Sequence, residues 1–142
     1  MSTEEDVVVV DKLSIYFYQE QQFVRAVEDA SFRIPEEGRF GLAGESGSGK
    51  TQTALAVAGL VEGTPGVVDG DIWIDGTNTL GELGAHCSVD RRDNGVCVQK
   101  DVQQWRRERE EVMKGLRGRV VSMVFQEPKG ALSPYYTIGE QA

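Results

Sequence analysis

Cysteine, histidine and proline are scarce in this sequence, and it contains no long apolar run. Its 142 residues include two cysteines, one histidine and four prolines. Two cysteines are too few for a disulfide-based scaffold. No apolar run approaches the ~20 residues that a membrane-spanning helix needs, and the acidic residues 1–6 lack the basic segment of a secretory signal. These absences argue against a disulfide-rich secreted domain and an integral membrane protein.

Basic residues are also in the minority. Lys and Arg number 15 against 23 Asp and Glu, which gives a formal net charge of −8 at pH 7. Such a charge opposes nonspecific binding to nucleic acid or to anionic lipid. With 39% hydrophobic residues, the chain has the length and composition to bury a core of its own. The composition therefore predicts one soluble, intracellular globular domain, with no nucleic acid among its partners.

The first half of the sequence mixes strand-like and helix-like patterns. The β-branched run 7–10 and further short segments up to residue 34 predict an antiparallel β region. A short apolar strand is predicted at 39–43. Residues 50–60 are mostly Ala, Leu and Val without proline, which favours a buried helix. A strand is predicted at 71–75, where an Asp-Gly pair closes it.

An irregular stretch follows. Residues 77–100 show no period and are predicted to form a surface excursion. His86, Cys87 and Cys97 lie in it, but a structural zinc site usually has four ligands at tight spacing. We interpret these three residues as solvated loop residues, with zinc binding as the alternative.

A helix and a buried strand are predicted after this stretch. Asp101, with Gln104 three residues later, has the pattern of a capping box that opens a helix. Oppositely charged side chains four residues apart are predicted to pair on the exposed side of this helix. These pairs are Arg106–Glu110 and Arg107–Glu111. The nearly continuous apolar run 120–125 is typical of a strand buried on both faces of a parallel sheet.

Residues 44–51 read Gly-Glu-Ser-Gly-Ser-Gly-Lys-Thr, which fits the P-loop pattern G-x-x-x-x-G-K-[ST] at every fixed position. The glycines let backbone N–H groups curl around a phosphate chain, and the following helix turns its positive end toward it. Lys50 is predicted to reach the β- and γ-phosphates, and the Thr51 hydroxyl to ligate Mg²⁺. The predicted nucleotide-binding residues of this loop are Gly44, Glu45, Ser46, Gly47, Ser48, Gly49, Lys50, Thr51 and Gln52.

The run 41–50 around this loop resembles the nucleotide-binding subunits of ABC transporters, in particular those of oligopeptide and dipeptide importers. Residues 124–128, Val-Phe-Gln-Glu-Pro, and the stretches 131–134 and 137–141 resemble the Q-loop segment of that subfamily. The resemblance covers almost the whole chain except about residues 81–100. It implies an α/β fold, a P-loop NTPase of the ABC type. Residues 1–142 would form the N-terminal part of one nucleotide-binding domain, with an antiparallel β region and part of a parallel core sheet.

The resemblance also implies roles for single residues. Phe17 matches the aromatic residue that stacks on the adenine ring, with Tyr16 and Tyr18 as near alternatives. Gln126 matches the catalytic-site glutamine that contacts Mg²⁺ and the attacking water, because its amide offers both an acceptor oxygen and donor hydrogens. Tyr135 and Tyr136 follow it and are expected near the contact with the membrane partner.

Several motifs of the family do not occur in these 142 residues. The Leu-Ser-Gly-Gly-Gln signature, the second acidic strand with its catalytic glutamate and the switch histidine are absent from the sequence. Without the glutamate, no residue would polarise the attacking water as the family does. The chain is therefore expected to be an N-terminal part that binds Mg-ATP with little or no hydrolysis by itself.

The function that the resemblance implies is an ATP-binding subunit of an ABC importer, which couples ATP hydrolysis to transmembrane transport of peptides or similar solutes. The implied partners are integral-membrane permease subunits, a second ATP-binding subunit and, indirectly, an extracytoplasmic solute-binding protein. The implied location is cytoplasmic, on the inner face of the membrane. The alternatives are another P-loop enzyme, such as a small kinase or GTPase, and a non-transport ABC-type ATPase of the regulatory or DNA-repair kind.

Overall fold

A four-stranded antiparallel sheet forms the base of the fold in the computed structural model, which describes residues 6–93, 95–127 and 133–141. The long strands β1 (Asp6–Gln19) and β2 (Gln22–Pro35) form a hairpin. Strand β3 (Pro65–Ile74) pairs with the other side of β1, and the short β4 (Thr77–Asn78) pairs with β3. The strand order is β2-β1-β3-β4. The predicted antiparallel β region is thus confirmed, with β3 longer than expected.

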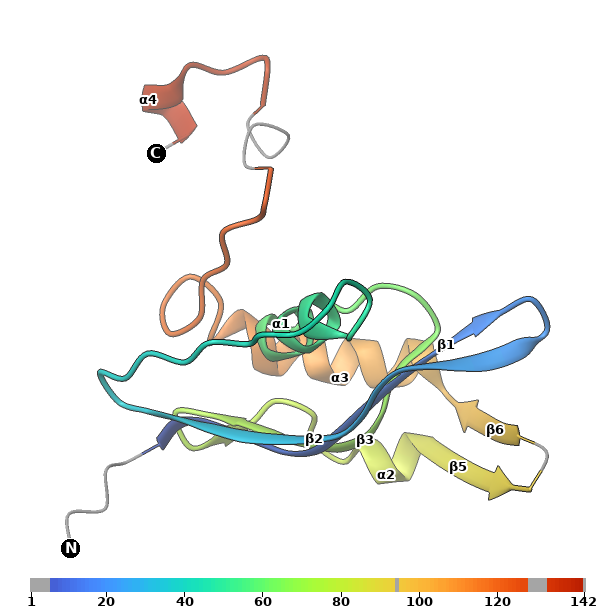
Figure 1. The fold of residues 1–142 in the computed structure, drawn as a ribbon. Coiled ribbons are helices and arrows are strands. Elements are labelled where there is room, and N and C mark those ends of the chain that lie inside the picture. The colour runs from blue at the N-terminus through green and yellow to red at the C-terminus, as the bar shows by residue number, and fades with distance from the viewer. Residues whose placement is uncertain (1–5, 94, 128–132, 142) are drawn as a thin grey trace, which may run out of the picture.

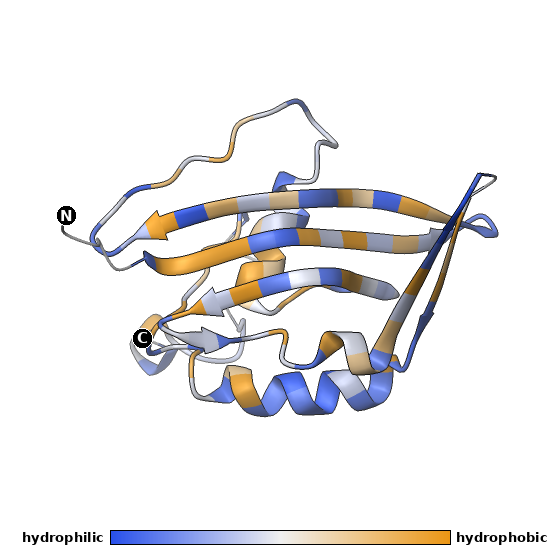
Figure 2. Cartoon of the chain, turned by 90° about the horizontal axis from the view of Figure 1, so that it is seen from below, coloured by the Kyte–Doolittle hydropathy of each residue, from blue (hydrophilic) through white to orange (hydrophobic). Residues whose placement is uncertain are grey.

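Two longer helices pack on this sheet: Figure 1 shows α1 above the strands, and Figure 2 shows α3 running along the β3–β4 side. Helix α1 (Lys50–Ala58) follows the glycine-rich loop and ends at Gly59, whose φ of 74° suits glycine. Helix α3 (Val102–Lys114) begins where the Asp101 side chain accepts a hydrogen bond from the Gln104 N–H at 3.0 Å. Both helices were predicted from the sequence.

The side chains on α3 pair differently from the prediction. The Gln104 side chain donates to Glu108, so only the Asp101 half of the capping box is present. The carboxylates expected to pair with arginines four residues earlier instead pair with cations that follow them. These ion pairs are Glu110–Arg117 at 2.6 Å and Glu111–Lys114 at 2.5 Å. Pairing toward the end of the helix places the cations near its negative pole, which is the favourable end for them.

The core lies between the sheet and the helices. Ile15 of β1 and Ile72 of β3 are fully buried on the inner face, and Met113 and Trp105 of α3 pack over them. Figure 2 shows the three long strands from below with α3 alongside them. The Trp105 indole N–H donates to the Leu80 carbonyl at 3.1 Å, so its one polar atom is satisfied inside the core. Aliphatic residues of β1 and β3 therefore hold both helices in place.

The predicted irregular excursion is wrong for residues 83–100. They form the short helix α2 (Leu83–His86) and a two-stranded hairpin of β5 (Cys87–Arg92) and β6 (Gly95–Lys100). Val89 and Val98 face each other across the hairpin on its less exposed side. The hairpin is ordered because it docks on β3: the Lys100 ammonium donates to the carbonyls of Pro65 and Val67.

Two predicted strands of the parallel core sheet do not form in the described part of the chain. Residues 39–43 and 122–125 have no strand pairing there, and the parallel contact present is a single bridge between Arg117 and Val121. A strand needs a hydrogen-bonded neighbour, and apolar sequence alone does not supply one. Helix α4 (Ile138–Gln141) stands apart from the sheet and the other helices (Figure 1). The predicted Q-loop residues 128, 131 and 132 lie outside the described residues.

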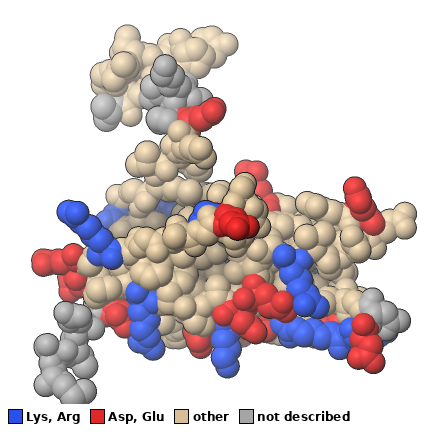
Figure 3. Space-filling view, in the orientation of Figure 1, with Lys and Arg blue, Asp and Glu red and all other residues tan. Residues whose placement is uncertain are grey.

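Charged side chains of both signs are interspersed on the face of the molecule that Figure 3 shows. Figure 3 shows acidic and basic groups alternating along the lower part of one face rather than separating into patches. The face shown in Figure 3 therefore carries no broad basic surface of the kind that binds nucleic acid.

Within the residues that the structure describes, no helix combines the length and apolar character needed to cross a bilayer.

Candidate functional site

The loop before α1 is a tight bend that depends on glycine. Gly47 and Gly49 have φ values of 82° and 88°, in the left-handed region that disfavours other residues. A Cβ at Gly49 would lie 2.4 Å from the carbonyl oxygen of Ala26 in β2. The loop therefore rests on β2, and its curvature requires a residue without a side chain at position 49.

Lys50 spans the loop. Its ammonium donates to the Gly44 carbonyl at 2.8 Å, to the Glu45 carbonyl at 2.5 Å and to the Ser48 hydroxyl at 3.0 Å. The three donors of the ammonium thus hold three oxygens of one bend together. Residues 44–48 wrap around the same cation that the sequence predicted to contact phosphate.

Helix α1 begins directly after this bend, so its first-turn N–H groups open toward the loop. These groups have no partner within the helix, and they carry its positive partial charge. Thr53, which is buried, fixes the junction: its N–H and hydroxyl both reach the Gly49 carbonyl, each at 2.9 Å. The exposed Thr51 lies in the first turn. The arrangement offers a ring of backbone donors with a hydroxyl beside it.

A cavity of about 420 Å³ lies over the bend and the first turn of α1. Its lining comes from the loop, from the helix start and from Ala26 of β2. Sequence reasoning did not assign Ala26 to the site, because nothing in the pattern of β2 shows which of its carbonyls meets the loop. The backbone N–H groups of the loop and of the first turn of α1 suit an anion with several charges.

A second cavity, of about 660 Å³, brings the predicted site residues together. Lys50, Thr51 and Gln52 line it together with residues 123–126, so Gln126 faces the same cavity as the start of α1. The Gln52 side-chain oxygen is buried and has no hydrogen-bond partner among the described residues. A buried acceptor of this kind fits a bound donor such as water on a cation. Residues more than 70 positions apart in sequence thus line one cavity.

Of the three candidate aromatic residues, two keep an accessible ring. Tyr16 is fully buried and its hydroxyl donates to Glu28 at 3.1 Å, so the core occupies both faces of its ring. Burial raises the pKa of the Tyr16 hydroxyl. Phe17 is half-buried against Gly63, and Tyr18 is 54% exposed. The described residues that line the two cavities do not include Phe17 or Tyr18.

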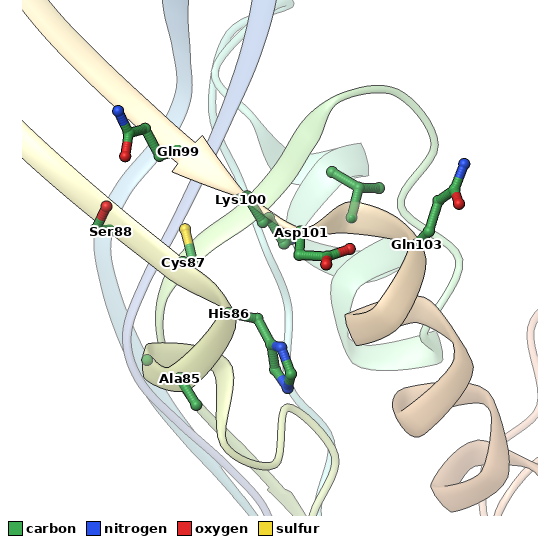
Figure 4. A pocket seen from close by; sticks show the side chains of 10 residues that line it. Ala85, His86, Cys87, Ser88, Gln99, Lys100, Asp101 and Gln103 are labelled. Atoms are coloured by element: carbon green, nitrogen blue, oxygen red, sulfur yellow. The ribbon is translucent and has the colours of Figure 1, made fainter.

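A shallow hollow of about 650 Å³ lies where the hairpin of β5 and β6 meets α2 and the start of α3. Figure 4 shows His86, Cys87, Lys100 and Asp101 around it, with the His86 ring directed away from Cys87. The His86 Nε2 lies 2.9 Å from the Glu108 carboxylate, and Cys97 is exposed farther along β6. No group of three or more metal-ligating side chains occurs within the described ranges.

The comparisons with known proteins agree with this geometry. Residues 27–141 match the ABC transporter family. The chain is 37% identical over 142 residues to the glutathione import ATP-binding protein GsiA of Pectobacterium atrosepticum, and 34% identical over 136 residues to that of Escherichia coli O1:K1. These alignments cover 99% and 96% of this chain but 19% of each relative, so the chain spans about a fifth of their length. The chain belongs to the ABC transporter family, as a P-loop NTPase domain of the ABC type.

Proposed function

We propose that this chain binds Mg-ATP at the loop before α1. The longer protein would then be the ATP-binding subunit of an importer for peptides or similar solutes. The observation that carries the proposal is the cavity that Lys50, Thr51 and Gln126 line together. The relatives support the transport role, because they are named for glutathione import and glutathione is itself a short peptide.

Each residue of the site has a role that its chemistry supports. The N–H groups of the loop and of the first turn of α1 bind the phosphate oxygens. Lys50 exchanges one of its loop acceptors for a phosphate oxygen, which keeps its charge at the bend. The Thr51 hydroxyl and the Gln126 amide oxygen would hold Mg²⁺, which neutralises phosphate charge when bound. Phe17 or Tyr18 would stack on the adenine ring.

We infer that these 142 residues bind nucleotide without turning it over efficiently. The signature motif and the catalytic glutamate do not occur in them. Residues 44–52 and 126 would therefore bind Mg-ATP, whereas its efficient hydrolysis would need groups from other parts of the longer protein.

The partners follow from the transport role. Integral-membrane permease subunits would contact the region after Gln126, where Tyr135 and Tyr136 are 89% and 64% exposed. A second ATP-binding subunit would form a dimer with this one, and a solute-binding protein outside the membrane would deliver the solute. The subunit would then lie on the cytoplasmic face of the membrane. The other P-loop enzymes considered above are less favoured, because both the family match and the relatives are of the ABC type.

Titration with a fluorescent ATP analogue in the presence of Mg²⁺ tests the site. Lys50→Ala should abolish binding, because the loop loses the cation around which it is wrapped. Lys114→Ala, at an exposed lysine of α3, is the matched control and should leave the affinity unchanged. Equal affinity of the wild type and Lys50→Ala would reject the site. The affinities for ATP and for inorganic triphosphate are also measured in Phe17→Ala and Tyr18→Ala. Loss of the residue that stacks on adenine should weaken the binding of ATP but not the binding of triphosphate.

A further inference from the structure

Arg109 of α3 is a buried cation without an anion beside it. The residue is 8% exposed, and its Nε and Nη2 atoms are buried without a hydrogen-bond partner among the described residues. The ion pairs formed by those residues do not include Arg109 either. Its guanidinium carbon lies 4.9 Å from the centroid of the Trp105 ring, a cation–π contact that offsets only part of the cost of burial. A buried charge with two unsatisfied donors strongly destabilises a fold, so the site needs an acceptor.

The neighbouring side chains add positive charge around Arg109. Burial, and after it the charges of Arg117 and Arg106, lower the pKa of Arg109 to about 10, so the guanidinium is still protonated at neutral pH. The acidic neighbour that raises this pKa is Glu110, whose carboxylate is already paired with Arg117 at 2.6 Å. The charges nearby therefore leave the Arg109 guanidinium without a counterion.

A small cavity lies against Arg109, between α3 and the start of β3. Its volume is about 10 Å³, which is room for roughly one particle of the size of a water molecule. Polyatomic anions such as phosphate and sulfate are too large for it. Its lining residues come from α3, from the start of β3 and from the loop before β3: Val102, Trp105, Arg106, Arg109, Pro65, Gly66, Val67, Val61 and Gly63. None of them lines the two cavities of the proposed nucleotide site.

A segment from elsewhere in the longer protein is not the missing partner. The described residues already shield the Nε and Nη2 atoms of Arg109 from solvent. A carboxylate from outside could reach these atoms only if the residues that cover them moved aside, and a close-packed interior resists such a movement. The partner therefore has to be small enough to occupy the cavity itself.

Charge distinguishes an anion from a water molecule as the occupant. A water molecule would accept a hydrogen bond from Arg109 but would bring no negative charge to a group of three arginines. An anion of one atom accepts from both N–H groups, and hydrogen bonds between charged partners are the stronger kind. Because the guanidinium is buried in any case, an anion beside it pairs a charge that otherwise stays unpaired. Chloride is the common anion that is closest to water in size.

We propose that this cavity is a binding site for one chloride ion, which accepts hydrogen bonds from the Nε and Nη2 groups of Arg109. The ion joins α3 to the start of β3, because both elements line the cavity. It stabilises the fold and takes no part in nucleotide chemistry. The inference is independent of the proposed binding of Mg-ATP.

Thermal unfolding at constant ionic strength tests the site. Circular dichroism follows the unfolding of the wild type in mixtures of potassium chloride and potassium gluconate at one total concentration. Gluconate is too large for the cavity, so only the chloride concentration changes the occupancy while the screening stays the same. A ligand that binds the folded chain alone should raise the ratio of folded to unfolded chain by up to tenfold for each tenfold rise in chloride above its Kd.

Two variants assign the effect to Arg109. Arg109→Met removes the charge and both donors while keeping an unbranched side chain, so it should melt at the same temperature in every mixture. Arg107→Met is the matched control, because Arg107 is an exposed arginine of the same helix. It should keep the full dependence on chloride.

A second measurement needs no variant and serves if Arg109→Met does not fold. Bromide replaces chloride in halide sites and scatters X-rays anomalously. Crystals of the wild type soaked in potassium bromide should show an anomalous peak within hydrogen-bonding distance of Nε and Nη2 of Arg109.

Three results overturn the proposal. One is a wild-type melting temperature that is the same in all mixtures. Another is a dependence on chloride that Arg109→Met retains or that Arg107→Met loses equally. The third is a cavity that holds only water in the bromide-soaked crystals.

Discussion

At the scale of single residues, the two glycines in the bend before α1 allow backbone strain to be distinguished from a steric clash. Gly47 and Gly49 share a left-handed φ, but nothing lies within 4 Å of a Cβ built on Gly47, whereas one on Gly49 would meet the Ala26 carbonyl. Gly47→Ala should therefore cost only the backbone term, about 1–2 kcal/mol. Gly49→Ala adds a collision with a main-chain atom, so it should lower the melting temperature further and weaken Mg-ATP binding more.

The two glycine variants serve as controls for each other. Thermal unfolding followed by circular dichroism gives the stability, and nucleotide titration gives the affinity. Equal effects of both substitutions would mean that the loop does not rest on β2.

The aromatic candidates show what the sequence could and could not predict at this scale. The period of two in a strand predicts that Tyr16 and Phe17 face opposite sides of the sheet. The structure has register shifts between Leu13, Ile15 and Tyr16, and residues 13–16 are all buried in succession. A bulge is set by the pairing of three strands, so it is not visible in the sequence of one. The P-loop, by contrast, was predictable because its chemistry is local.

At the scale of secondary-structure elements, the errors of the sequence-based predictions again arise where a structure depends on distant partners rather than on its own segment. Helices α1 and α3 were predicted because their hydrogen bonds and caps lie within the segment itself. The segments 39–43 and 120–125 have strand-like sequences, yet their state depends on partner strands elsewhere. The hairpin of β5 and β6 carried a signal that was overlooked: an Asn-Gly pair preceded by Val89 and followed by the alternating Val96 and Val98. The residues of the hollow beside it were therefore misjudged as loop.

The cap of α3 provides the second prediction. The Asp101 carboxylate accepts from the Gln104 N–H, while the Gln104 side chain makes no reciprocal contact with Asp101. Asp101→Ala should lower the free energy of unfolding by about 1 kcal/mol, measured by urea denaturation. Gln104→Ala should change it by less than about 0.5 kcal/mol. A larger effect of Gln104→Ala would show that the full capping box forms in solution.

The third prediction concerns the element that anchors the hairpin. Burial lowers the pKa of Lys100 to about 7. Two contacts of its ammonium favour the charged form and oppose this effect: the hydrogen bonds to two carbonyls, and the Trp105 ring, whose centroid is 3.6 Å away. Between pH 7 and the unfolded value of about 10.4, the unfolded chain binds more protons than the folded one. The free energy of unfolding should therefore rise with pH in that window, with a slope of up to about 1.4 kcal/mol per pH unit, and stay flat below it.

Urea denaturation from pH 6 to 8.5 measures this slope. The Cys87 thiol keeps its proton in that range, because burial raises its pKa. Lys100→Met should remove the rise, whereas Lys114→Met, at an exposed lysine, should retain it. A slope that survives in Lys100→Met would assign the pH dependence to another group.

At the scale of the whole molecule, the described core and the nucleotide site have different supports. Apolar residues of β1, β3 and α3 form one buried cluster, which includes Ile15, Ile72 and Met113. Residues 123–126 face that body only across a cavity, and Val124 is 86% exposed. The loop before α1 thus rests on β2, whereas residues 122–125 have no strand pairing among the described residues. The two sides of the proposed nucleotide site therefore differ in how closely they pack against the rest of the described chain.

The overall charge gives the last prediction. The chain carries a net charge of −8, and most ion pairs among the described residues are exposed, so they contribute little to stability. Salt should therefore screen more repulsion than attraction, and the melting temperature should rise between 0.1 M and 1 M KCl as the screening length falls from ~10 Å to ~3 Å. Glu20→Gln combined with Glu36→Gln removes two exposed negative charges, so this variant should melt higher in low salt and respond less to KCl. A melting temperature that falls with KCl in both proteins would mean that specific ion pairs, rather than net repulsion, dominate the electrostatics of the fold.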